Sequence, residues 1–161
     1  MDAEMHVEPA HGTLTDAERE IIRSGLDEVN DAADRRYRPR PFAFVVRDAE
    51  GTVVGGAEGN AGPHWAYVAT LWVHANLRGA GWGARLMASV EDEALRRNCR
   101  GVCLTTFTHQ APGFYERLGY AEHGRLPEWP GEHRIYYAKL LGPAGSPGSP
   151  RVPRRRRLTL R

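Results

Sequence analysis

Two hydrophobic periods alternate along this chain and divide it into expected helices and strands. Helical spacing first appears after the capping box Thr15-Asp16-Ala17-Glu18, and it predicts a helix that extends to about Ala33. The apolar stripe of this helix consists of Ile21, Ile22, Leu26 and Val29. Ahead of it, we expect a short first strand over residues 4–8.

The rest of the patterned region alternates short apolar runs with turn residues and two further helical stretches. The apolar runs predict strands over residues 42–47, 52–56, 65–73, 101–107, 120–124 and 133–140. Helical spacing covers about 83–97 and 112–118, and Gly119 ends the second helix. The central strand–helix–strand–helix–strand order predicts an α/β sheet with a parallel portion, flanked by antiparallel hairpins.

Composition places the chain among globular proteins with one hydrophobic core. It has 161 residues, of which 41% are apolar and 26% charged. No apolar run is long enough to cross a membrane, and the first ten residues lack the pattern of a secretory signal. The two cysteines, Cys99 and Cys103, suit reduced, packed thiols better than a disulfide framework. We therefore expect a cytoplasmic protein.

Charge is divided unevenly between the body of the chain and its end. Residues 142–161, GPAGSPGSPRVPRRRRLTLR, contain six arginines and no acidic residue. The remaining 141 residues hold 16 basic and 20 acidic side chains, a net charge of −4. We expect a folded domain over 1–141 and a disordered basic tail over 142–161, which could contact nucleic acid or an acidic surface weakly and without specificity.

The segment with the clearest chemistry is LWVHANLRGAGWGAR, residues 71–85, in which a strand leads through a glycine-rich turn into a helix. The first N–H groups of a helix have no partner within it, and the helix dipole favours negative charge at that end. Glycine lets the backbone approach a phosphate closely. The sequence therefore predicts a site for a phosphate-bearing cofactor.

Three interpretations of the glycine turn follow from the residues themselves. A nucleotide P-loop requires Lys followed by Ser or Thr, and neither follows the second glycine. The dinucleotide pattern is matched by Gly79, Gly81 and Ala84, but the next strand, 101–107, ends without the acidic residue that this pattern requires. The turn could also simply tighten the connection between strand and helix.

The motifs of this chain resemble those of the GNAT acetyltransferases. Arg78-x-x-Gly81-x-Gly83, directly after Leu71-x-Val73, is similar to the pyrophosphate loop of that family. Residues 108–120 resemble the second GNAT signature, and the Gln-Ala-Pro before Phe114-Tyr115 together with the closing segment 130–140 resembles a bacterial subgroup. The resemblance covers about residues 12–141. It implies a GNAT fold: a mixed, mostly antiparallel sheet with a splayed central parallel strand pair, flanked by about four helices.

The resemblance also implies a reaction and a cofactor site. Acetyl-CoA would be the cosubstrate, without a metal, and an amine of a small-molecule acceptor would attack it directly in a ternary complex. The pyrophosphate would lie on the backbone N–H groups of Arg78, Gly79, Ala80, Gly81, Trp82, Gly83 and Ala84. The pantetheine arm would lie along the backbone of Leu71, Trp72 and Val73 and beside Thr108, where many relatives carry asparagine.

The same resemblance names a general acid and leaves the general base open. It implies that Tyr115 protonates the leaving thiolate, a role that suits a side chain protonated at pH 7. Ala69 stands where many members carry a glutamate base. A water relay could replace this base, as could one of three side chains, namely His74, His109 and Glu58. The missing glutamate also leaves open a non-catalytic module that binds acyl-CoA.

The acceptor is not identified by the sequence. In this family the acceptor is selected around the first helix, by the connection 35–40 and by the segment 122–132. Aromatic candidates for its pocket are Trp65, Tyr67 and Trp129, together with His133. The acidic body favours a cationic amine. A homodimer is also among the expected assemblies.

Overall fold

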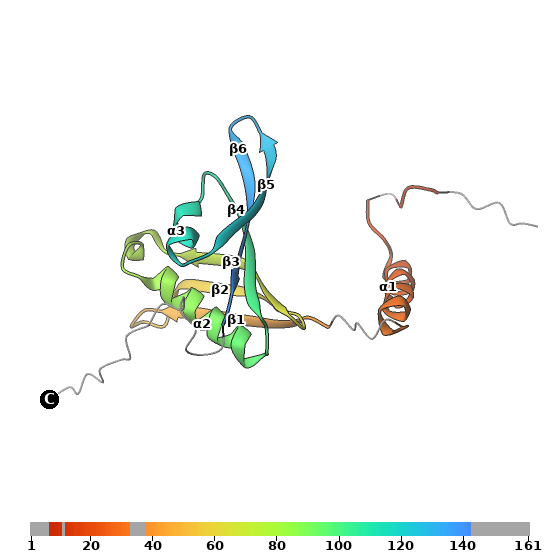
Figure 1. Cartoon of the computed structure of the whole chain (residues 1–161), viewed down its shortest axis with the longest axis horizontal. Helices are drawn as coiled ribbons and strands as arrows, with labels where there is room; N and C mark the ends of the chain where they lie inside the picture. Colours follow the sequence, from red (N-terminus) through yellow and green to blue (C-terminus); the bar gives the residue numbers. More distant parts are fainter. Residues whose placement is uncertain (1–6, 11, 33–37, 143–161) are drawn as a thin grey trace, which may run out of the picture. The chain divides into compact units, whose positions relative to one another are not determined.

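The computed structural model describes residues 7–10, 12–32 and 38–142, and the chain divides into two units, residues 1–37 and 38–161. The first unit contains helix α1, Asp16–Ala32 (Figure 1). The predicted capping box is confirmed, because the Thr15 N–H donates to Glu18 Oε2 at 2.7 Å and the Glu18 N–H donates to Thr15 Oγ1 at 3.3 Å. Of the strand expected over 4–8, only Val7 and Glu8 lie among the described residues, and they form no strand.

The second unit is built on one six-stranded sheet with the order β1-β2-β3-β4-β6-β5 (Figure 1). Its strands are β1 (Arg40–Arg47), β2 (Val53–Ala61), β3 (Trp65–Val73), β4 (Gly101–Phe107), β5 (Ala121–Trp129) and β6 (Glu132–Leu140). Helix α2 spans Trp82–Arg96, helix α3 spans Pro112–Arg117, and a 3₁₀ turn, η1, spans Ala75–Leu77. The described residues thus contain three α-helices and one 3₁₀ turn, where about four helices were expected.

Strands β3 and β4 form the parallel pair of the sheet, and all other neighbours are antiparallel. The pairing joins Trp65–Val68 of β3 to residues 101–104 of β4 and then stops, although both strands continue. Figure 1 shows them diverging, β3 toward the loop before α2 and β4 toward the segment before α3. The predicted splayed pair in a mixed α/β sheet is confirmed.

A bulge in β3 lies where the two strands part. Glu58 of β2 pairs with Thr70, whereas the next residue, Gly59, pairs with Val68, so Ala69 is the extra residue of β3. A bulge bends its strand and increases the local twist. The bulge therefore helps to turn the end of β3 away from β4.

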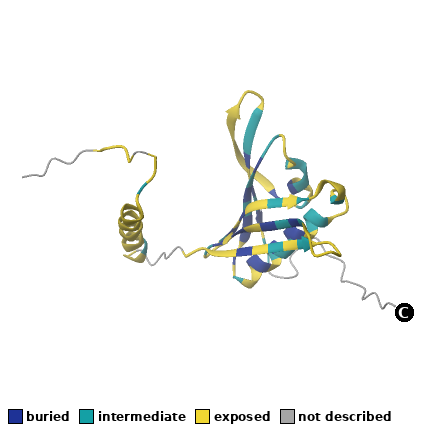
Figure 2. Ribbon diagram, turned by 180° about the vertical axis from the view of Figure 1, so that it is seen from behind, coloured by how far each residue is buried: buried dark blue, intermediate teal, exposed yellow. Residues whose placement is uncertain are grey.

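The hydrophobic core lies between the sheet and helix α2, as the buried residues in Figure 2 show. Helix α2 contributes the apolar side chains that its period predicts, namely Leu86, Met87, Val90 and Ala94, all at most 4% exposed. The sheet contributes buried side chains from its central strands, among them Val102, Leu104, Ile135 and Tyr137. Full burial of one such aliphatic side chain is worth about 1.5–3 kcal/mol, so this face fixes α2 and the turn before it.

A buried ion pair joins α2 to β6 beside this core. Lys139 Nζ donates to the two carboxylate oxygens of Glu91 at 2.8 and 2.9 Å, and the Tyr120 hydroxyl donates to the same carboxylate at 3.0 Å. Both charged side chains are largely covered, at 7% and 15% exposure. The two cysteines are free thiols, as expected, with Cys99 buried and Cys103 half-buried.

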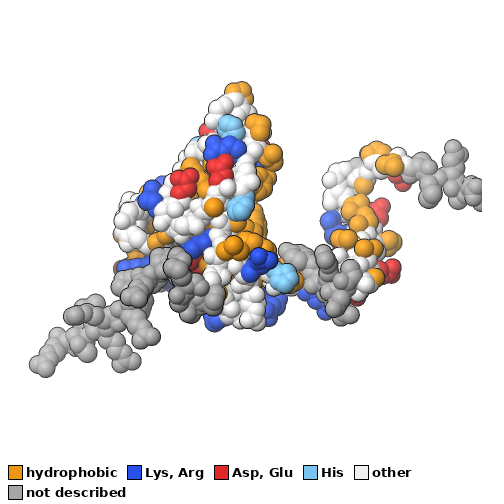
Figure 3. All heavy atoms as spheres, in the orientation of Figure 1, with side chains coloured by type: hydrophobic (Ala, Val, Ile, Leu, Met, Phe, Trp, Pro, Cys, Tyr) orange, Lys and Arg blue, Asp and Glu red, His pale blue; other side chains and the backbone are white. Residues whose placement is uncertain are grey.

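Strand β5 is longer than the sequence predicts. A strand was expected only to Gly124, but pairing with β6 continues to Trp129, opposite Glu132. Pro130 and Gly131 close the hairpin, and Gly131 has a φ of +83°. Charged side chains of both signs lie together on this hairpin (Figure 3), among them the pairs Arg125–Glu122 and Arg134–Glu128.

Candidate active site

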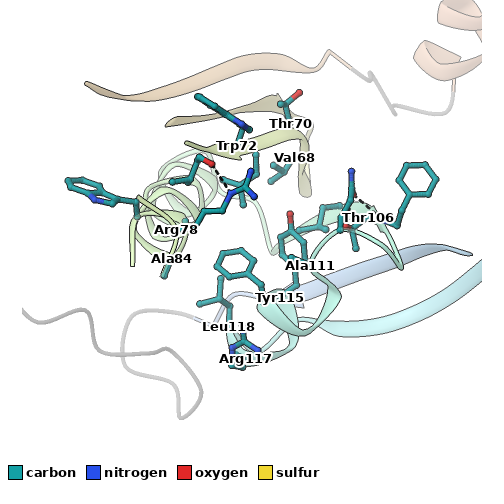
Figure 4. Close-up of a pocket in the computed structure, with 18 of the residues that line it drawn as sticks. Val68, Thr70, Trp72, Arg78, Ala84, Thr106, Ala111, Tyr115, Arg117 and Leu118 are labelled. Atoms are coloured by element: carbon teal, nitrogen blue, oxygen red, sulfur yellow. Dashed lines mark hydrogen bonds between the residues drawn. The ribbon is translucent and has the colours of Figure 1, made fainter. Parts of the chain in front are cut away.

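A cleft of about 920 Å³ opens in the wedge between the diverging ends of β3 and β4, and the start of α2 and helix α3 complete its walls (Figure 4). Most residues that the sequence predicts for the cofactor lie on its wall. They are Leu71, Trp72, Val73, Arg78, Gly79, Gly81, Trp82, Gly83 and Ala84, together with Tyr115. Ala80 and Thr108 are not among the lining residues.

The glycine turn presents a helix N-terminus to this cleft. Gly79 and Gly81 have φ values of +79° and +83°, a conformation that glycine adopts without the penalty of a Cβ atom. Gly81 is the N-cap of α2, and no side chain caps the helix. The N–H groups of residues 82–84 therefore have no partner within the helix, and the residues that carry them line the cleft. The sequence prediction of an anion site at this position fits that geometry.

Two contacts hold the turn against its surroundings. The Arg78 Nε–H donates to the Val73 carbonyl at 3.1 Å, which ties the turn to the end of β3 (dashed line in Figure 4). Gly83 lies against α3 so closely that a Cβ atom there would be 3.1 Å from the Phe114 ring. Trp82 packs against its own helix, with the Arg85 guanidinium 4.6 Å from its ring centroid. The turn and the start of α2 are thus positioned by β3 on one side and by α3 on the other.

One edge of β3 is available to a ligand. Beyond Val68 the strand pairs with β2 on one side, and no described strand pairs with its other side. Residues 69–73 all line the cleft. Backbone N–H and C=O groups on this edge can therefore bind an extended polar chain, in the way that an added strand binds a sheet edge.

Tyr115 reaches the cleft from the opposite side. Its ring extends from α3 toward β3 (Figure 4) and packs edge-on against Phe114 and Tyr120, with centroids 5.0 and 6.1 Å apart. The hydroxyl makes no hydrogen bond with another described residue. Burial raises the pKa of Tyr115 above its ordinary value, so the phenol remains a proton donor throughout the neutral range.

The hydroxyl of Thr108 is engaged elsewhere. It donates to Glu132 Oε2 at 2.7 Å and accepts the N–H of His133 at 2.9 Å. The neighbouring His109 does line the cleft, and its Nδ1 lies 2.9 Å from the same Glu132 oxygen. Hydrogen bonds from His109 and Thr108 hold the pKa of Glu132 below its ordinary value. A contact between Thr108 and the cofactor stays a prediction.

Among the described residues, the polar lining of the cleft contains cations and no carboxylate. Arg78 and Arg117 are its charged side chains, and this balance suits an anionic ligand. Of the expected bases, His74 is used structurally, because its Nδ1 accepts the Asn76 N–H at 3.3 Å at the start of η1. Glu58 does not line the cleft, but its Oε1 accepts the hydroxyl of Thr70, which does, at 3.1 Å.

A family model described as "Acetyltransferase (GNAT) family" matches residues 12–120. The chain belongs to the GNAT family. The predicted family and fold class are confirmed, and with them the enzyme class, N-acetyltransferase. GNAT enzymes use acetyl-CoA and act on small-molecule acceptors.

Curated relatives and a solved structure agree with this assignment. Over 90 residues the chain is 42% identical to Blasticidin-S acetyltransferase of Streptomyces morookaense. This match covers 55% of the chain and 66% of that enzyme, so the chain spans just under two thirds of the enzyme's length. Over 114 residues it is 34% identical to an acetyltransferase of Agrobacterium fabrum, covering 70% and 83% of the two chains. The crystal structure of an acetyltransferase from Bacillus cereus ATCC 14579 superimposes with a TM-score of 0.74 at 28% identity, covering 85% of this chain and 98% of that one.

The cleft lining also includes polar residues that were not singled out from the sequence, among them Arg117, Gln110 and Thr70. Arg117 follows the Phe114-Tyr115 motif by two residues and lines the cleft. Gln110 belongs to the Gln-Ala-Pro segment, and its Oε1 accepts the Thr106 hydroxyl at 2.8 Å and the Phe107 N–H at 3.1 Å. Thr70 has no motif of its own, since its position depends on the bulge in β3.

The described residues show neither a metal centre nor a membrane span. No cluster of three His, Cys, Asp or Glu side chains among them could hold a metal ion. None of the helices described is long and apolar enough to span a membrane. The cytoplasmic location and the homodimer stay predictions, and the basic tail lies outside the described residues from 143 onward.

Proposed function

We propose that this chain transfers the acetyl group of acetyl-CoA to the amine of a small-molecule acceptor. The observation that carries the proposal is the convergence of three features on one cleft: the uncapped start of α2, the free edge of β3 and the Tyr115 hydroxyl. Family membership supplies the reaction class. The acceptor, the cofactor contacts and the roles of individual residues are parts of the proposal.

The residues present fit acetyl-CoA. The free N–H groups at 82–84 and the guanidinium groups of Arg78 and Arg117 suit its pyrophosphate, and the edge of β3 at 71–73 suits the amides of its pantetheine arm. Bound acetyl-CoA supplies the thioester. A backbone N–H on the edge of β3 would polarise the thioester carbonyl and stabilise the oxyanion that forms when the amine attacks. Tyr115 would then donate its proton to the departing sulfur.

The acceptor is proposed to be a cationic amine. The acidic body, with a net charge of −4 over residues 1–141, attracts cations. Blasticidin S is the first compound to test, because the Streptomyces relative carries it in its name. Alkylamines and arylamines complete the panel, since they differ in whether the attacking nitrogen is protonated at pH 7.

The test is thiol release from acetyl-CoA over this amine panel, with the acetylated amine identified by mass spectrometry. We expect release that requires both acetyl-CoA and one of the amines. No release with any amine, from a protein that still binds acetyl-CoA stoichiometrically, would contradict the proposal. That result would favour the second candidate, a module that binds acyl-CoA without catalysis. The absence of a carboxylate among the described lining residues supports this second candidate.

A further inference from the structure

The point where β3 leaves β4 brings a carboxylate within one hydrogen bond of a residue that lines the cleft. The last parallel pair is Val68 with Leu104, and the bulge at Ala69 follows it directly. Thr70 is therefore the first paired residue of β3 inside the wedge, and its partner across the sheet is Glu58 of β2. Figure 4 shows Thr70 on β3 and Tyr115 on α3 on opposite sides of the cleft, with the Tyr115 ring pointing toward β3.

Glu58 is connected to the cleft by one hydrogen bond. The Thr70 hydroxyl donates to Glu58 Oε1 at 3.1 Å, and no hydrogen bond between described residues occupies Oε2. Among the described residues, the other carboxylate bonded to a lining residue is that of Glu132, whose Oε2 already accepts the Thr108 hydroxyl and lies 2.9 Å from His109 Nδ1. Glu58 thus has a free acceptor oxygen beside the wedge.

We propose that Glu58, with Thr70, is the general base that takes the proton from the attacking amine. This assignment rests on the proposed acetyl transfer. Glu58 first takes a proton from the ammonium form of the amine, and the freed nitrogen lone pair then forms the bond to the acyl carbon. The carbon–sulfur bond breaks as the resulting oxyanion collapses. This first proton reaches Glu58 directly or through the Thr70 hydroxyl, which accepts one proton and passes its own to the carboxylate, and the second amine proton passes to solvent after the carbon–nitrogen bond has formed. The sulfur takes the proton of Tyr115, so base and acid act from opposite sides of the cleft, and solvent later restores both groups.

Few titratable groups surround Glu58 in the sheet. Its strand β2 contains no other titratable residue, and its partners across the sheet are Ala43 on β1 and Thr70 on β3. The titratable groups of the two packed strands are Arg40 and Arg47, at the ends of β1, and Tyr67 on β3. Neither neighbouring strand carries a second carboxylate.

The test compares kcat/KM from pH 6 to pH 10 for the wild type and Glu58→Gln, using the alkylamine of the panel that the wild type acetylates fastest. A positioned base typically contributes about 10²–10⁴-fold, so Glu58→Gln should lose at least ~100-fold at pH 7. The deficit should shrink as the pH approaches the pKa of the amine, because the amine then arrives deprotonated. The control is Glu50→Gln, which also removes one negative charge but lies in the turn between β1 and β2, away from the cleft. Its kcat/KM should equal that of the wild type.

Two further variants separate proton transfer from structure. Thr70→Val should reproduce part of the loss, whereas Thr70→Ser keeps the hydroxyl and should restore activity. If kcat/KM of Glu58→Gln equalled that of the wild type at every pH, the assignment of Glu58 as the base would be overturned, and the proposed function would stand. The assignment would also be overturned if His109→Gln, and not Glu58→Gln, removed the activity at pH 7. Absence of turnover in the wild type itself would overturn the proposed function, and this assignment with it.

Discussion

Tyr115 has three properties that a proton donor in this cleft needs. It lines the cleft, its hydroxyl makes no bond with another described residue, and burial raises its pKa. A tyrosine in water ionises near pH 10, so a raised pKa keeps the phenol protonated at least to that pH. The proposed acid should therefore cause no loss of kcat on the alkaline side below about pH 10.

Replacing Tyr115 with Phe should lower kcat by about 100-fold and leave the melting temperature nearly unchanged. The aromatic ring and its contacts with Phe114 and Tyr120 remain, and the hydroxyl has no partner among the described residues to lose. Thiol release and a thermal melt measure the two effects. Tyr136→Phe, on the exposed side of β6, removes the same atom as a control. Equal kcat values for Tyr115→Phe and the wild type would exclude Tyr115 as the acid.

At the scale of elements, the glycine turn before α2 connects backbone conformation to binding. Replacing Gly81 with Ala forces a Cβ atom into a φ of +83° and should cost about 1–2 kcal/mol of stability. Gly51→Ala is the matched control, because Gly51 has a φ of +85° and equally open surroundings in the turn between β1 and β2. Both variants should lose similar stability in urea unfolding, while only Gly81→Ala weakens acetyl-CoA binding in calorimetry. Equal affinity in both variants would exclude the turn as the pyrophosphate site.

The ion pair between Lys139 of β6 and Glu91 of α2 should affect the stability of the fold more than the rate of acetyl transfer. Lys139→Met leaves the Glu91 carboxylate without its buried cation, and breaking such a pair costs about 3 kcal/mol. Arg125→Met breaks an exposed pair with Glu122 and should cost under about 1 kcal/mol. Urea unfolding of both variants measures the difference, and equal losses would show that burial of the Lys139–Glu91 pair is unimportant.

The sequence predicts the elements of the sheet better than it predicts the contacts between them. The expected strand 65–73 matches β3, because its apolar side chains and β-branched residues are local signals. The prediction ended β5 too early, at Gly124, because Gly124 and Pro127 are unfavourable in a strand. Pairing with β6 nevertheless extends β5 past both residues. The bulge at Ala69 depends equally on pairing with a second strand, so the bond between Thr70 and Glu58 could not be predicted from spacing.

The cleft shows the same limit. The glycine turn and Tyr115 lie in continuous motifs and were predicted from them. The Thr108 hydroxyl, by contrast, is bonded to Glu132, 24 residues away in the chain. Contacts of that kind follow from the register of β4 and β6, which no local pattern encodes.

At the scale of the whole molecule, the opposite charges of body and tail suggest separate roles. Leu141 packs against the core and its N–H donates to the Arg100 carbonyl at 2.8 Å, so the folded contacts reach at least that residue. Deleting residues 142–161 removes six arginines and should abolish salt-sensitive binding of RNA while acetyl transfer continues at the wild-type rate. Filter binding at two salt concentrations and thiol release check this. Loss of activity on deletion would place part of the catalytic domain beyond residue 141.

Thiol release by the full chain with acetyl-CoA and the amine panel tests the central claim most directly. We predict amine-dependent release with one acetylated amine formed per thiol, and a rate that falls by about 100-fold in Tyr115→Phe. Stoichiometric acetyl-CoA binding without release from any amine would contradict the claim, and the cleft between β3 and β4 would then be a binding site without catalysis.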